Sequence, residues 1–198
     1  LTVGGADAVG AGVSAAQHHH VLAIGPDRTG FGIFENLRHG QFRWRPLHDI
    51  HPEVKPGSDL RVVELDGNVS WDLLLAGPKG LQSLLTTTSR PGTVQPLRVH
   101  QVHTEPTLQL RPCDYDNDGY TDLVCLGGQG VRLYRGSGNG SFTPSSTSGL
   151  DQANDVISAQ VADLDQDGDQ DLALLTSRGI ELKRNQGGDK NHWLDIRI

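Results

Sequence analysis

Short apolar runs of six to eight residues, separated by turns rich in glycine, aspartate and proline, follow one another along this chain. Such runs are typical of β-strands, whereas an amphipathic helix needs a longer segment with apolar positions three and four residues apart. The composition agrees, because the chain has 25 glycines and 10 prolines but only 5% aromatic residues. With 35% hydrophobic residues it can still form a core. The pattern predicts an all-β fold.

The apolar runs come in pairs, and the pairs recur about 50 residues apart. The first run of each pair covers 20–25, 72–77, 122–128 or 171–177, and the second covers 30–37, 80–85, 130–136 or 179–185. The stretch 111–142 overlays 160–188 at a shift of 49 positions, and 62–85 follows the same pattern at a shift of 50. A weaker copy at 19–44 keeps the strands without the acidic residues. The chain is therefore built from repeats.

Each repeat predicts one strand before an acidic turn, two apolar strands after it, and a fourth strand beyond a glycine-rich turn. Four antiparallel strands in about 50 residues is the size of one β-propeller blade. We expect about four blades, at 1–47, 48–98, 99–148 and 149–188. Three arrangements stay open: further blades outside this sequence, a four-bladed ring, or a ring completed by another chain. Because the chain contains no Met, we expect a piece of a longer protein that holds further blades.

Two of the turns concentrate aspartates, at 114–122 and 163–171. Both read D-x-D-x-D-G-x-x-D, which places carboxylates at positions 1, 3, 5 and 9, a glycine at 6 and a main-chain carbonyl at 7. Carboxylates this close repel one another or take raised pKa values unless a cation lies between them. Calcium accepts six to eight oxygens in loose geometry, whereas magnesium is stricter and zinc prefers nitrogen and sulfur. We therefore predict two structural calcium sites.

These loops have two other possible interpretations. An EF-hand shares the first nine positions but needs a glutamate at position 12 and flanking helices. Position 12 is Cys125 in one loop and Leu174 in the other, and both follow directly on from apolar strand residues. The loops should therefore join β-strands. The second interpretation is an acidic turn that is exposed to solvent and binds no ion. It remains an alternative, although the presence of two full copies one blade apart argues against it.

A third loop departs from the pattern. Glu64, Asp66, Asn68 and Asp72 occupy the four acidic positions, but Asn68 is neutral and Val69 replaces the glycine. We expect a weak metal site there, or none.

Cys113 and Cys125 flank the first acidic loop and can face each other across its hairpin. Two cysteines make no disulfide framework. Both a single disulfide and two buried thiols stay open.

The units DYDNDGYTDLVCLGGQGVRLYRGSGNGSF and DLDQDGDQDLALLTSRGIELKRNQGG resemble FG-GAP/VCBS repeats, the blades of integrin α-chain-like propellers. The final RNQGGDKNHWLDIRI is similar to the junction at which such repeats enter an ASPIC/UnbV module, as in the cartilage acidic protein family. The resemblance therefore implies that 189–198 begins such a segment. It is strong over about 105–198 and fair over 55–100.

The resemblance also implies propellers of about seven blades, secretion or surface exposure, and roles in adhesion or ligand binding. Carried over by position, the ligands are Asp114, Asp116, Asp118, Tyr120 (main chain) and Asp122 for one calcium ion, and Asp163, Asp165, Asp167, Asp169 (main chain) and Asp171 for the other. We expect a non-catalytic extracellular or periplasmic module that binds a protein or a glycan. The open alternatives are a polysaccharide lyase, which needs a base in a basic channel, and a lectin that uses Trp44, Trp71 or Trp193.

Charge and motifs exclude several other functions. The formal charge of −7 comes from 24 acidic and 17 basic residues, and nine of the acids lie in the two full loops. The sequence has no basic patch interleaved with aromatic residues, so it gives little support to nucleic-acid binding. No apolar run approaches the roughly 18 to 20 residues that span a bilayer. The histidines at 18–20 would alternate between strand faces and cannot converge on one ion. The sequence contains no G-x-S-x-G motif and no Cys/His nucleophile arrangement that would indicate an enzyme.

Overall fold

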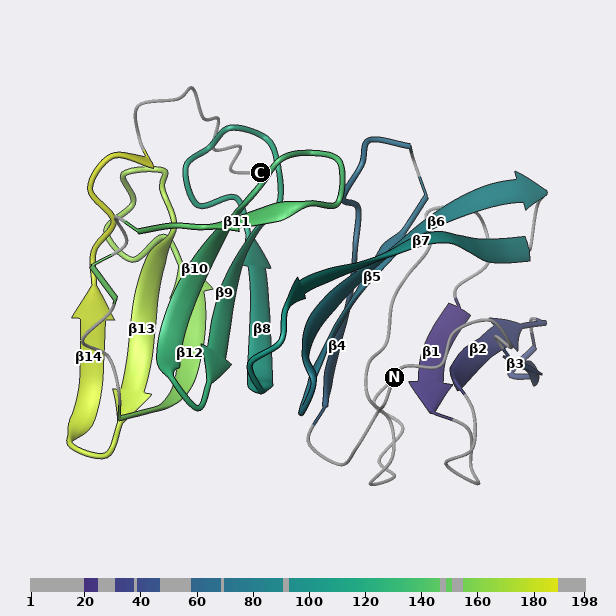
Figure 1. Cartoon of the computed structure of the whole chain (residues 1–198), viewed down its shortest axis with the longest axis horizontal. Helices are drawn as coiled ribbons and strands as arrows, with labels where there is room; N and C mark the ends of the chain where they lie inside the picture. Colours follow the sequence, from purple (N-terminus) through teal and green to yellow (C-terminus); the bar gives the residue numbers. More distant parts are fainter. Residues whose placement is uncertain are drawn as a thin grey trace.

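The structure, a computed structural model, describes residues 20–24, 31–37, 39–46, 58–68, 70–90, 93–146, 149–150 and 155–188. Within these residues it contains β-strands and no α-helix, so the all-β prediction is confirmed. The strands form four antiparallel sheets that follow one another along the chain (Figure 1). Among the described residues no helix has the length and apolar character needed to cross a membrane.

Each sheet corresponds to one repeat and is called a blade. Blade 1 contains β1 (His20–Ile24), β2 (Phe31–Asn36) and β3 (Phe42–Pro46). Blade 2 contains β4 (Asp59–Val63), β5 (Asp72–Gly77), β6 (Gly80–Arg90) and β7 (Thr93–His103). Blade 3 contains β8 (Thr107–Cys113), β9 (Asp122–Gly127), β10 (Gly130–Gly136) and β11 (Phe142–Pro144). Blade 4 contains β12 (Val156–Ala162), β13 (Asp171–Thr176) and β14 (Gly179–Lys183).

The strand positions follow the repeat. The second apolar strand begins at the aligned position in blades 2, 3 and 4, and β1 begins at its counterpart, His20. Blade 2 runs to His103 rather than to the expected boundary at 98, because β7 pairs with β6 as far as Leu81. The described strands form an open row and not a closed ring (Figure 1), so a four-bladed ring is not what the structure shows.

The core lies between neighbouring blades, and β9 contributes to two interfaces. Leu123 and Cys125 pack into the cluster shared with blade 2. Val124 and Leu126 pack into the cluster shared with blade 4. Because successive side chains of a strand point to opposite faces, a strand between two blades is apolar at every position. This explains why these strands read as continuous apolar runs rather than as alternating ones.

The two cysteines are free thiols, which answers the question that the sequence left open. In the β8–β9 register Cys113 pairs with Asp122, three residues before Cys125. This odd offset places the two thiols on opposite faces of the blade, so they cannot form a disulfide with each other. Burial raises the pKa of each thiol to about 12, which keeps both protonated at neutral pH.

Candidate functional site

Three acidic clusters lie in the loops between the first and second strands of blades 2, 3 and 4. These loops occupy the same edge of the row of sheets, the upper edge in Figure 1. The clusters consist of Glu64, Asp66 and Asp72; of Asp114, Asp116 and Asp122; and of Asp163, Asp165 and Asp171. In each cluster every residue offers one carboxylate oxygen, and these oxygens lie within 4.8 Å of one another. The structure thus brings together loop positions 1, 3 and 9 in all three blades, and each cluster could hold a metal ion.

The aspartate at position 9 is buried in each loop and ties the loop to the third strand of its blade. One of its oxygens accepts a hydrogen bond from the main-chain N–H of loop position 2, and the other accepts one from the third strand or just beyond it. The donors and N···O distances are Leu65 (2.9 Å) and Thr86 (2.8 Å) for Asp72, Tyr115 (3.0 Å) and Gly136 (2.7 Å) for Asp122, and Leu164 (3.0 Å) and Asn185 (2.8 Å) for Asp171. We call this arrangement the aspartate clasp. The sequence indicated only a metal ligand at this position.

The carboxylate at position 1 organises the turn itself. Asp114 accepts hydrogen bonds from the N–H groups of Asp118 and Gly119, both at 3.0 Å. Asp163 accepts them from Gln166 at 2.6 Å and Gly168 at 3.1 Å.

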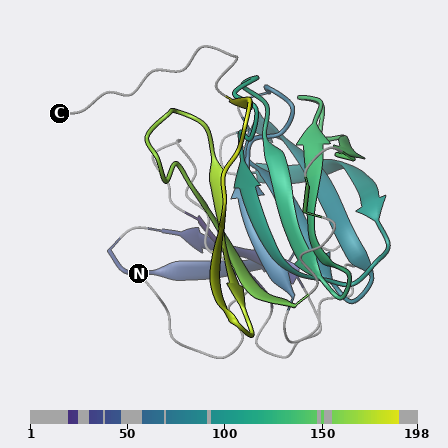
Figure 2. The same cartoon turned by 90° about the vertical axis from the view of Figure 1, so that its left-hand side faces the viewer.

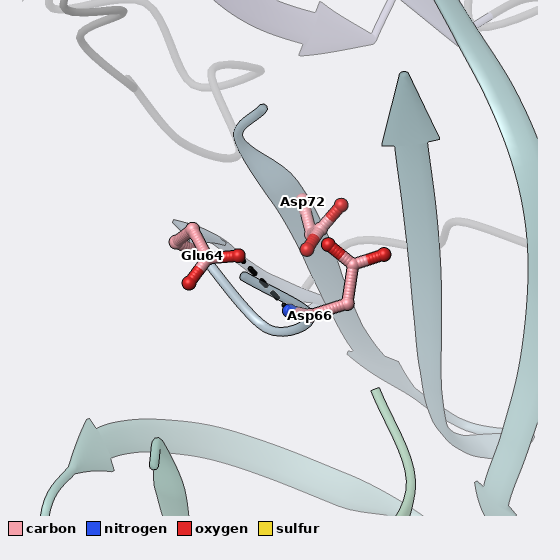
Figure 3. Close-up of side chains that lie close together, drawn as sticks. All are labelled: Glu64, Asp66 and Asp72. Carbon is pink, nitrogen blue, oxygen red and sulfur yellow. Dashed lines mark hydrogen bonds between the residues drawn. The ribbon is translucent and has the colours of Figure 1, made fainter. Parts of the chain in front are cut away.

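The same organisation extends to the degenerate loop of blade 2. Glu64 accepts hydrogen bonds from the N–H of Asp66 at 3.0 Å and from the N–H of Gly67. Figure 3 shows the three carboxylates of this loop gathered around one space, with the Asp66 bond dashed. Glutamate at position 1 therefore takes the same role as aspartate in the two full loops.

A left-handed backbone at position 4 recurs in the three loops. The sequence analysis did not predict it. Asn117 has a φ of 55° and Gln166 a φ of 65°, in a region that side chains rarely adopt. Gly67 occupies this position in blade 2 with a φ of 75°. The glycines at position 6, Gly119 and Gly168, also have positive φ. The third loop therefore has its glycine at position 4 instead of position 6, and both positions have a left-handed backbone in the full loops.

An arginine pairs with the aspartate at position 3 in the two full loops. Arg135 forms an ion pair with Asp116, and Arg184 forms one with Asp165 at 2.8 Å. Both arginines lie 19 residues after their aspartates, and Leu85 takes the corresponding place in blade 2. This regularity is visible in the sequence, but without the fold nothing connects the two positions.

The predicted side-chain ligands at position 5, Asp118 and Asp167, are not members of the three-residue clusters. Asp118 is exposed and accepts a hydrogen bond from the N–H of Tyr120 at 2.8 Å. Asp167 accepts one from Asp169 at 3.2 Å. The Asp169 side chain is fully buried, and its charge adds to burial in raising the pKa of Tyr115 in the neighbouring loop.

The neutral residue at position 5 of the third loop, Asn68, holds the turn through its amide. It donates to the carbonyl of Thr86 at 2.9 Å and to Asp66 at 3.1 Å, and its oxygen accepts a bond from Ser70 at 2.7 Å. The amide thus stabilises the loop without adding a fourth negative charge.

Burial and mutual repulsion raise the pKa of two clasp aspartates, Asp72 and Asp122. The pKa of Asp72 rises from 3.8 to about 6, mainly because burial disfavours its charge, and the charges of Asp66 and Glu64 add to this. Hydrogen bonds from Thr86 and Leu65 oppose the shift. Burial likewise raises the pKa of Asp122. The clusters of blades 2 and 3 therefore carry an electrostatic cost that a bound cation would remove.

The donor set fits a hard divalent cation. Every cluster presents carboxylate oxygens, and no cysteine or histidine belongs to any of the three. In blade 4, Oδ1 of Asp165 is buried and accepts no hydrogen bond among the described residues, although Oδ2 is paired with Arg184. A buried carboxylate oxygen without a donor is costly. Coordination of a cation by this oxygen would remove that cost.

The loops of adjacent blades are also bonded to each other. The amide of Asn117 donates to the carbonyls of Gly168 and Gly188, both at 3.0 Å. In return, the amide of Asn185 donates to the carbonyl of Tyr115 at 2.8 Å. Ordering one acidic loop therefore favours order in the next.

Asp122→Ala removes the clasp of blade 3 and leaves the N–H groups of Tyr115 and Gly136 without their acceptor. We expect the free energy of unfolding to fall by about 2–4 kcal/mol even with chelator present, because these bonds need no ion. Urea denaturation in chelator measures this. The control Asp118→Ala, at an exposed position of the same loop, should change the value by less than about 0.5 kcal/mol. Equal effects of the two variants would show that the clasp has no structural role.

Comparison with known proteins gives one family match in this region. The model of the FG-GAP-like repeat family matches residues 114–174, from position 1 of the loop in blade 3 into β13 of blade 4. The chain thus contains an FG-GAP-like repeat where the resemblance was strongest. The expected ASPIC/UnbV segment at 189–198 lies outside the described residues. No curated protein matches the chain.

A solved structure shares the fold. It belongs to an Agrocybe aegerita lectin described for its specific recognition of non-reducing terminal N-acetylglucosamine. The match has a TM-score of 0.62 at 19% sequence identity, and it covers 89% of this chain and 48% of the lectin chain. This chain therefore spans about half the length of that lectin, and at this identity the likeness concerns the fold.

Proposed function

We propose that this chain is part of a calcium-stabilised β-propeller that binds a glycan in the extracellular space or the periplasm and catalyses no reaction. The observation that carries the calcium component is the threefold recurrence of a carboxylate cluster at the same loop positions, with a buried clasp aspartate in each. The remaining blades of the ring are supplied from outside this sequence or by another chain.

Calcium is the cation that best suits these clusters. The oxygens come from a loop on one side and the start of a strand on the other, and calcium tolerates irregular coordination better than magnesium. Asp114, Asp116 and Asp122 would hold one ion, and Asp163, Asp165 and Asp171 another. Glu64, Asp66 and Asp72 form a third candidate of lower affinity, because the neutral Asn68 replaces the carboxylate at position 5.

The ions would act on stability and not on chemistry. Each cluster lies between two strands of a blade, and its last aspartate is already bonded to the main chain on both sides. A cation there neutralises the repulsion and fixes the loop against the third strand. A catalytic role would need a base or nucleophile in addition to the carboxylates that hold the ion.

A glycan is favoured as the ligand by the likeness to a lectin that recognises terminal N-acetylglucosamine. Among the described tryptophans, Trp71 is 39% exposed and lies in the loop of blade 2, whereas Trp44 is half-buried. An exposed indole can stack on the apolar face of a sugar ring. Trp193 lies outside the described residues.

Removal of calcium should lower the melting temperature. A site filled at about 100 times its Kd contributes about 2.7 kcal/mol, and each kcal/mol shifts Tm by about 2–4 °C for a chain of this size. Two sites therefore predict a loss of at least about 10 °C in chelator, measured by differential scanning fluorimetry. Calcium should restore Tm better than magnesium. An unchanged Tm in chelator, followed by no response to either ion, would contradict the proposal.

The glycan component predicts binding on a glycan array that includes terminal N-acetylglucosamine, followed by calorimetry with the best ligand. Trp71→Ala should weaken binding by about tenfold or more through loss of stacking. Phe42→Ala, which alters another exposed aromatic on blade 1, should leave binding unchanged. Failure of the calcium-loaded protein to bind any glycan would refute this component. Release of unsaturated ends from acidic polysaccharides would instead indicate a lyase.

A further inference from the structure

Two rings from neighbouring blades stack on each other where blades 2 and 3 meet. His103 ends β7 of blade 2, and Tyr134 lies in β10 of blade 3. Their ring centroids are 5.0 Å apart, and the angle between the ring planes is 14°. Tyr134 is buried in the apolar cluster that the two blades share. In Figure 2, which views the row from its blade 4 end, blade 2 lies behind blade 3. The imidazole of His103 is therefore part of the contact between two blades.

Hydrogen bonds determine which nitrogen of the neutral His103 ring carries the hydrogen. The hydroxyl of Thr107 donates its single hydrogen to the carbonyl of Glu105, with an Oγ1···O distance of 3.2 Å. The same hydroxyl oxygen lies 3.3 Å from Nε2 of His103, where it must therefore accept a hydrogen bond. Nε2 thus carries the hydrogen, and the lone pair of the ring is left on Nδ1.

Nδ1 of His103 faces a second acceptor. It is buried and makes no hydrogen bond to any residue that the structure describes. Oε2 of Glu105 lies 3.5 Å from it, so a lone pair and a carboxylate oxygen point at each other. A proton taken up by Nδ1 would change this repulsion into an ion pair with Glu105. The ring is thus placed to bind a proton at the junction of the two blades.

The other groups around the ring oppose a positive charge there. Cys125, Arg132 and Tyr134 line the same small cavity as His103 and Glu105. Burial raises the pKa of the Cys125 thiol to about 12 and also raises the pKa of Tyr134, so both stay neutral. Burial is likewise the main cause that lowers the pKa of His103 below 6.5. The carboxylate of Glu105 opposes this shift, and the charge of Arg132 adds to it.

We propose that the stacked His103 and Tyr134 form a proton-sensitive junction, which holds blades 2 and 3 together while the imidazole is neutral and loosens when Nδ1 binds a proton. Protonation would charge a side chain that is only 12% exposed and is packed against a buried phenol. Glu105 compensates in part only, because its side chain is 45% exposed and water screens its charge.

The proposal depends neither on the ions nor on a glycan. The cavity beside His103 also touches Gly127 and Gly130, at the turn between β9 and β10. The acidic loop of blade 3 precedes Asp122 at the other end of β9. The junction and the carboxylate clusters therefore lie at opposite edges of the blade.

The direction of the pH effect follows from the lowered pKa. A histidine of the unfolded chain takes up its proton near pH 6.5, whereas folded His103 does so only at lower pH. The contribution of the neutral ring to stability is therefore complete above pH 6.5 and is lost as the pH falls from that value through the folded pKa.

Thermal melting in saturating calcium at about pH 8 and about pH 5 tests the proposal. His103→Phe keeps a flat ring against Tyr134 but cannot be protonated. Between the two pH values the wild type should lose at least about 2 °C more in Tm than this variant. Equal losses in the two proteins would overturn the proposal.

His39→Asn is the matched control. It removes an exposed histidine between β2 and β3, at a left-handed position that asparagine tolerates. This variant should keep the pH dependence of the wild type. If His39→Asn removed the pH dependence as fully as His103→Phe, the effect would not belong to the junction and the proposal would be overturned.

Imidazole NMR of the isotope-labelled full chain gives a readout that does not rely on the stability of a His103 variant. The ring of His103 should titrate below pH 6.5 and carry its hydrogen on Nε2 above that pH. Arg132→Gln, at an exposed position, removes the neighbouring cation and should raise this pKa. A His103 pKa of 6.5 or more in the wild type, or no response to Arg132→Gln, would overturn the proposal.

Discussion

The structure depends on one constraint, the placement of a buried aspartate at the start of the second strand of blades 2, 3 and 4. Its two oxygens accept main-chain N–H groups from the loop on one side and from the third strand on the other. These bonds hold the loop in place, but they fix a negative charge beside two further carboxylates. The same aspartate thus orders the loop and brings repulsion between carboxylates. A cation bound there would remove the repulsion and keep the loop ordered.

Amide side chains beside the clusters also contribute to cohesion between blades. Asn117 and Asn185 bond the loops of blades 3 and 4 to each other directly above the apolar interface that the two sheets share. The apolar cluster fixes the spacing of the sheets, and the amides fix the relative position of the loops. A binding surface built from loops needs both a fixed sheet spacing and fixed loop positions, because these determine where the groups that contact a ligand lie.

Much of this arrangement could be predicted from the sequence, because the repeat fixes the register. The aligned positions His20, Asp72, Asp122 and Asp171 each begin a strand. The clasp, the arginine partners of Asp116 and Asp165, and the left-handed backbone at Asn117 could not be predicted. They depend on the third strand returning beside the loop, which spacing alone does not reveal. The neutral Asn68 at position 5 and Val69 at position 6 likewise concealed the similarity of the Glu64 loop to the other two loops.

The central claim is that the carboxylate clusters hold cations. The most direct measurement is an anomalous difference map from crystals grown in calcium. We expect a peak between the carboxylates of Asp114, Asp116 and Asp122, and another between those of Asp163, Asp165 and Asp171. We also expect Oδ1 of Asp165 to contact the ion. Maps without peaks at both clusters, at a calcium concentration that saturates ordinary sites, would contradict the central claim.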